Sequence, residues 1–160
     1  MNTSTDRDLL RHALSTIAYR AAKVLRDPPA DFGSFRIGPS SRTPVEILSH
    51  MGDLMAWGLS MAEGEERWFD NGSQDWAGQY VRFFEALGAF DAYLASDKAL
   101  GHPPTRLLQG PVADALTHVG QIAMLRRLAG TSVKGENYFK ADVQTGRVGP
   151  VQAAPISEFD

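Results

Sequence analysis

Apolar residues recur with a period of about 3.6 residues in four separate segments of this 160-residue chain, and residues that typically start or stop a helix bound each segment. The sequence therefore predicts helices over residues 6–26, 43–64, 76–94 and 111–127, the last of them beginning at or before 111. No long alternation of apolar and polar residues, which would indicate a half-buried strand, accompanies them. The pattern predicts an all-α fold, most naturally a helical bundle.

Particular residues set the expected helix boundaries. Pro28-Pro29 prevents the first helix from continuing, because proline lacks a backbone N–H and clashes with the preceding turn. Thr43 is a good N-cap for the second helix, and Pro44 suits its first position. The third helix follows the turn residues Asn71-Gly72-Ser73, and Gly130 is a natural cap at the end of the fourth.

Periodicity is lost after Gly130, where glycine, proline and polar residues become frequent. We therefore expect residues 131–160 to form an extended, irregular tail packed across the helices. The length is that of one compact domain, and the sequence shows neither an internal repeat nor a low-complexity tract. Residues 1–160 are thus predicted to be a single domain.

The amino-acid composition excludes several classes of function for this chain. The absence of cysteine leaves histidine, aspartate and glutamate as the plausible metal ligands and excludes thiolate catalysis by the chain itself. Sixteen basic residues are scattered among nineteen acidic ones, for a net charge of −3, which argues against nucleic-acid binding. Neither a signal sequence nor a long apolar span is present, so we expect no membrane partner and a cytoplasmic location.

Three residues form the strongest candidate site. Asp114 and His118 are one helical turn apart and project from the same face of the predicted fourth helix. His50 lies in line with Ile47 and Leu54 of the second helix, so it is expected to face inward. Two imidazoles and a carboxylate can bind Zn²⁺, Ni²⁺, Mn²⁺ or Fe²⁺ and leave coordination positions open. Alternatively, His50 and His118 are core histidines satisfied by hydrogen bonds, and Asp114 is an acid in the first turn that the helix dipole favours.

Two further residues are placed to orient the imidazoles. Asp53 follows His50 by three residues, and Gln121 follows His118 by three, so each can contact its neighbour's ring across one helical turn. The alternative for both is a solvated polar position at the edge of the helix.

Three aromatic residues, Trp57, Tyr80 and Tyr138, are candidates for lining a pocket, because each combines an apolar ring with a polar tip. Aromatic residues at helical spacing more commonly fill the core. His12 shares its helix face with polar residues and is expected at the surface, and His102 is expected on an exposed loop.

The segments 47–64 and 114–130 resemble the DinB/YfiT-like superfamily of metal-binding helical bundles. In that family a histidine on the second helix joins two histidines of an H-x-x-x-H-x-G-Q motif on the fourth. Here His50 matches the first of these, and His118-Val119-Gly120-Gln121 matches the end of the motif. Asp114 stands where the family has its middle histidine, and a carboxylate is a harder ligand than imidazole.

The resemblance implies an up-down-down-up four-helix bundle with a divalent metal ion held by His50, Asp114 and His118. It also implies a metal-dependent enzyme of small-molecule metabolism or detoxification, a thiol-dependent transferase or a hydrolase, with a low-molecular-weight thiol as a candidate substrate. Wide apolar helix faces and the habits of the family favour a homodimer. The alternative is a non-catalytic helical bundle that binds a small ligand or a protein partner.

Overall fold

The computed structural model describes residues 3–72 and 75–160, which are predominantly helical, as the sequence predicts. Ser73 of the predicted turn lies outside these ranges. The long helices in the described ranges are α1 (Thr3–Leu25), α2 (Pro44–Ala62), α3 (Trp76–Ala95) and α5 (Ala113–Leu128). Shorter elements are η1 (Phe32–Ser34), α4 (Pro104–Leu107), η2 (Leu108–Val112), β1 (Gly135–Glu136), η3 (Tyr138–Lys140) and β2 (Glu158–Phe159). None of the described helices combines the length and apolar character needed to cross a membrane.

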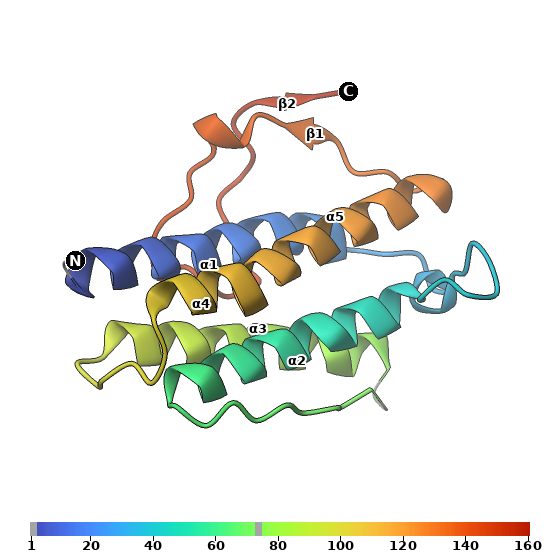
Figure 1. Ribbon diagram of the computed structural model, residues 1–160. Coiled ribbons are helices and arrows are strands. Elements are labelled where there is room, and N and C mark those ends of the chain that lie inside the picture. Colours follow the sequence, from blue (N-terminus) through green and yellow to red (C-terminus); the bar gives the residue numbers. More distant parts are fainter. Residues whose placement is uncertain (1–2, 73–74) are drawn as a thin grey trace.

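The four long helices enclose one apolar core. Helix α1 packs against α3 and α5, and α2 packs against the same two helices. Residues 63–72 run back along α2, and α2 and α3 point in one direction while α1 and α5 point in the other (Figure 1). Each long helix contributes fully buried side chains, among them Leu14, Ile17, Leu48, Met51, Phe83, Phe90, Ala115 and Ile122.

Side-chain caps fix where α2 and α3 begin. Thr43 Oγ1 accepts a hydrogen bond from the backbone of Glu46, and the Glu46 carboxylate accepts one from the backbone of Thr43 at 2.7 Å. This reciprocal pair is a capping box, and the predicted cap at Thr43 is confirmed. Asp75 caps α3 by accepting from the backbone of Gly78 at 2.8 Å.

The predicted fourth helix is divided into three parts. Helix α4 is followed by η2, a wide π-helical turn that contains Pro111, and α5 proper begins only at Ala113. Proline cannot donate the hydrogen bond that a regular helix requires at that position, which accounts for the wider turn. The irregular turn ends at Val112, two residues before Asp114. At the other end of α5, Gly130 has a φ of +74°, as expected for a residue that ends a helix.

The tail after Gly130 packs along α1 (Figure 1). Glu136 is buried and accepts hydrogen bonds from the Tyr19 hydroxyl at 2.7 Å and from Lys23 Nζ at 3.0 Å. Strands β1 and β2 pair antiparallel beside this cluster. The exposed His12 contacts Thr145 of the tail at 3.2 Å, so its predicted surface position is confirmed.

Candidate metal centre

Three potential metal ligands from two neighbouring helices converge in the structure. His50 comes from the middle of α2, and Asp114 and His118 come from the first two turns of α5, which packs against α2. One donor atom from each residue can be chosen so that all three lie within 4.8 Å of one another. Within residues 3–72 and 75–160, this is the single group of three or more such side chains close enough to share an ion.

The distances between the donor atoms suit a shared ion. His50 Nε2 lies 3.6 Å from Asp114 Oδ2, and His118 Nε2 lies 3.4 Å from Asp114 Oδ1. Both separations exceed the usual hydrogen-bond range of about 2.7–3.2 Å. Ligand atoms about 2.1 Å from a tetrahedral divalent ion lie about 3.4 Å from one another. The two separations from Asp114 are therefore compatible with a divalent ion shared by the three side chains.

His118 is held in the orientation that ligation requires. Its side chain is buried, and its Nδ1 lies 2.9 Å from Gln121 Oε1. An amide oxygen only accepts, so this contact places the ring proton on Nδ1 and leaves the Nε2 lone pair free. The free nitrogen is the one that faces Asp114. The predicted role of Gln121 as the residue that orients His118 agrees with this geometry.

His50 is half-buried, and its ring stands nearly perpendicular to that of His118, with centroids 4.8 Å apart. Burial lowers the pKa of His50 below its ordinary value, the neighbouring His118 and Arg42 lower it further, and the Asp114 carboxylate partly opposes this shift. The lowered pKa favours the neutral imidazole, which is the form that binds metal ions.

Asp53, the second predicted orienting residue, is engaged elsewhere. Its carboxylate is buried and accepts a hydrogen bond from Arg82 Nη1 of α3 at 2.8 Å. Arg82 is held in turn by Gln79 and Ser49. Burial raises the pKa of Asp53 despite the adjacent guanidinium. Asp53 thus links α2 to α3 instead of orienting His50.

The three predicted pocket residues are scattered. The half-buried Trp57 packs edge-on against Trp68, with centroids 5.8 Å apart, and so reaches the surroundings of His50. Tyr80 packs against Phe84 of its own helix. Tyr138 packs against Tyr19 and lies under the guanidinium of Arg20, 4.0 Å from its ring centroid. Neither tyrosine lines a hollow beside the three donors.

The loop segment over residues 63–72 brings one unpredicted residue, Trp68, to the site. Its ring centroid lies 5.5 Å from that of His50. His102 contacts the same loop, since its Nε2 lies 2.9 Å from Glu66 Oε1. Its imidazole is thus paired with a carboxylate away from the three donors. The loop has no apolar periodicity, so the sequence offers no signal that Trp68 would face the site.

Two hollows flank the three donors. One, of about 540 Å³, is lined by polar residues around His50, including Arg42 and Asp70. The other, of about 400 Å³, adjoins His118 and is lined mainly by apolar side chains. Arg42 borders both hollows. A small molecule can therefore approach His50 from the polar hollow and His118 from the apolar one.

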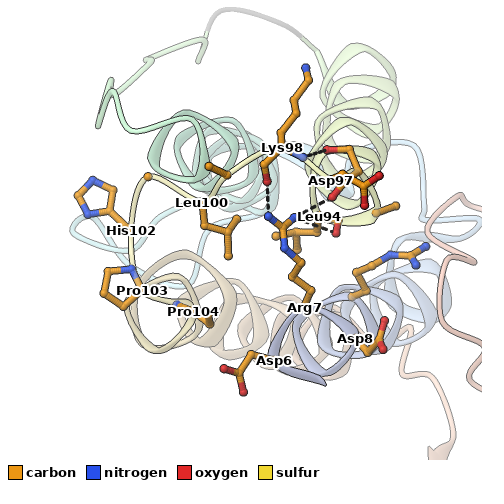
Figure 2. A pocket seen from close by; sticks show the side chains of 15 residues that line it. Asp6, Arg7, Asp8, Leu94, Asp97, Lys98, Leu100, His102, Pro103 and Pro104 are labelled. Atoms are coloured by element: carbon orange, nitrogen blue, oxygen red, sulfur yellow. Dashed lines mark hydrogen bonds between the residues drawn. The ribbon is translucent and has the colours of Figure 1, made fainter. Parts of the chain in front are cut away.

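A larger hollow, of about 860 Å³, lies between the start of α1 and the segment from Leu94 to Pro104. Figure 2 shows Arg7 at its centre. Arg7 donates hydrogen bonds to the carbonyl oxygens of Leu94 and Ser96 at 3.2 and 3.0 Å, and to that of Lys98. These bonds satisfy carbonyl groups at the end of α3, which is a structural role.

Comparison with protein-family models, curated proteins and solved structures finds no match to the chain. The His50, Asp114 and His118 group is able to hold a metal ion, and its donor types do not by themselves select one metal.

Proposed function

We infer that the protein is a divalent-metal-dependent enzyme of small-molecule metabolism or detoxification, with His50, Asp114 and His118 as the metal ligands. The observation that carries this proposal is the convergence of three donor atoms within 4.8 Å from two helices. The orientation of His118 by Gln121 supports it, because a ring held this way presents an unprotonated nitrogen to the ion.

The ligand set suits catalysis better than scaffolding. Three protein donors leave at least one coordination position for a small molecule, whereas structural sites usually supply four. Bound there, a divalent ion would supply Lewis acidity that activates a water or a thiol as nucleophile. Asp114 contributes one negative charge, and the neutral imidazoles of His50 and His118 contribute none. The proposed reaction class is thiol-dependent transfer or hydrolysis, with a low-molecular-weight thiol as a candidate substrate.

The proposal includes membership of the DinB/YfiT-like superfamily and its up-down-down-up four-helix bundle. Supporting it, α1 and α5 run opposite to α2 and α3 (Figure 1), and His50 and His118 stand at the family's ligand positions. Asp114 departs from the family's histidine yet faces both imidazoles. Because a carboxylate is harder than imidazole, we expect the ion to be Zn²⁺, Ni²⁺, Mn²⁺ or Fe²⁺, with harder ions favoured relative to a three-histidine site.

Thermal unfolding with and without each of the four ions tests the proposal. An ion that binds the folded chain selectively raises the melting temperature by mass action, stabilising it by about 2.7 kcal/mol at one hundred times the Kd. We expect a rise for the wild type and for the control His12→Ala, and little or none for Asp114→Ala. Unchanged melting with every ion would instead favour a non-catalytic bundle that binds a small ligand or a protein partner.

A further inference from the structure

An apolar hollow of about 400 Å³ opens beside the metal centre. Its polar end is formed by His118 and Gln121. Its apolar wall comes from three parts of the chain: the segment before α2, α2 itself and the last turns of α5. The apolar residues are Ile37, Ile47, Met124, Leu125 and Leu128.

Several of these apolar side chains face solvent. Ile37 is 57% exposed, Met124 53% and Leu128 54%. Exposed apolar side chains are ordinary when scattered, but a group that lines one hollow beside polar donors is typical of a ligand-binding site. The hollow is large enough for a small organic molecule but small for a large cofactor.

Arg42 adds a positive charge at the border between this hollow and the polar one around His50. Its side chain is exposed, and within residues 3–72 and 75–160 no carboxylate forms an ion pair with it. The other arginines near the site are paired: Arg36 with Glu46 and Arg82 with Asp53. Arg42 is thus free to bind an anion, and a guanidinium binds carboxylates in a bidentate manner.

We propose that the metal centre acts on a small amphipathic carboxylate, whose anionic group pairs with Arg42 and whose apolar body lies against Ile47, Met124 and Leu128. The catalytic part of this inference rests on the proposed function, but binding of the carboxylate does not require the ion. The charges agree with an anionic ligand in the apolar hollow, because Arg42 is the charged residue in its lining.

Calorimetric titration with octanoate and 1-octanol tests the proposal, since the two share an apolar chain and differ in the charged group. The proteins are the wild type, Arg42→Met and the control Arg127→Met, an exposed arginine of α5 outside the hollow. We expect one octanoate per chain, bound at least tenfold more weakly by Arg42→Met and unchanged in Arg127→Met. Octanol should bind more weakly than octanoate and show no dependence on Arg42. Equal octanoate affinity in wild type and Arg42→Met, or no octanoate binding, overturns the proposal.

Metal content, measured on the same samples, separates this inference from the proposed function. We expect Arg42→Met to take up zinc as the wild type does, because Arg42 is not a ligand. If the wild type binds no metal but still binds octanoate through Arg42, the metal proposal fails and the carboxylate site stands. If zinc binds normally and octanoate does not, the carboxylate site alone fails.

The other candidate occupant of the apolar hollow is a second copy of the chain. Sedimentation of the wild type and of Leu128→Asp decides this, because Leu128 is exposed on the hollow and its substitution should leave the fold intact. We expect Leu128→Asp to weaken octanoate binding without changing the oligomeric state. A dimer that Leu128→Asp converts to a monomer would show that the hollow is buried between two copies, and would overturn the proposal.

Discussion

The imidazole of His118 has neighbours on its own helix at both ring nitrogens. Gln121 holds Nδ1 at 2.9 Å, and Asp114 faces Nε2 at 3.4 Å. These residues are spaced three and four positions from His118, so one regular helix places all of them. Two of the three proposed ligands are therefore positioned by the geometry of α5, and His50 is brought to them by the packing of α2 against α5.

The contact between His118 and Gln121 predicts a specific loss of metal affinity. Gln121→Ala removes the acceptor that fixes the ring, and removal of such partners commonly weakens metal binding about 10- to 100-fold. We expect the loss in competition titrations with a zinc chelator. The control Gln109→Ala alters an exposed glutamine of η2 and should bind zinc as the wild type does. Equal affinity in Gln121→Ala and wild type would show that the contact does not orient a ligand.

The lowered pKa of His50 predicts how the metal-free protein responds to acid. An unfolded histidine has its ordinary pKa of about 6.5, so protonation of His50 favours the unfolded chain wherever its folded pKa lies lower. The contribution to stability is complete above about pH 6.5 and is lost as the pH falls through the folded pKa. Urea unfolding between pH 7.5 and 5 should show a steeper decline for the wild type than for His50→Gln. Equal declines in the free energy of unfolding of the two proteins would contradict a lowered pKa of His50.

At the residue scale the sequence predicted what a single helix determines. Asp114, His118 and Gln121 follow from spacing alone, and the inward direction of His50 follows from its apolar neighbours. Asp53 occupies a position equally suited to orienting His50, but Arg82 of α3 holds its carboxylate. Whether Asp53 contacts His50 or Arg82 depends on which helix packs against α2, and residue spacing within one helix does not reveal this.

At the scale of elements, α2 and α3 are tightly packed where a glycine of α2 faces an aromatic ring of α3. A Cβ atom at Gly58 would lie 2.6 Å from Phe90 Cε1, whereas one at Gly88 of α3 would meet no atom within 4 Å. Glycine at position 58 therefore permits the close packing of the two helices.

This difference predicts opposite effects for the same substitution. Gly58→Ala should destabilise the protein by about 1–3 kcal/mol, because Phe90 is fully buried and has little room to move. Gly88→Ala should stabilise it by about 0.5–1 kcal/mol, because alanine favours an open helical position. Urea midpoints measure both changes, and a loss of stability no larger in Gly58→Ala than in Gly88→Ala would contradict the packing described.

Element boundaries were predictable where a local signal marks them. Thr43 and Pro44 start α2, and Gly130 ends α5, as their types predict. The start of the predicted fourth helix was less accurate, because the wide turn at Pro111 separates α4 from α5. Apolar periodicity continues through such a turn, so it cannot distinguish one helix from two joined by an irregular turn.

At the scale of the whole molecule, the tail is attached to α1 by side-chain contacts that the sequence pattern does not predict. Lys23 bridges Glu136 and Glu158 at 3.0 and 2.7 Å, and thereby holds both strands of the tail. The irregular composition of residues 131–160 indicated a packed, extended segment, but the pairing partners depend on tertiary structure.

We expect the protein to be a homodimer, as the wide apolar faces of its helices suggest. Leu9 and Leu108 are exposed and line a further apolar hollow, which leaves apolar surface for a second copy. Sedimentation equilibrium should show a species of twice 17.5 kDa. A single 17.5 kDa species across the concentration range would contradict this expectation.

Elemental analysis of protein purified without a metal-affinity step tests the central claim most directly. The convergence of His50, Asp114 and His118 predicts one divalent ion per chain in the wild type, either bound on purification or taken up stoichiometrically on addition. His118→Ala should hold none while remaining folded. A wild-type protein that neither carries nor takes up a stoichiometric ion would contradict the account.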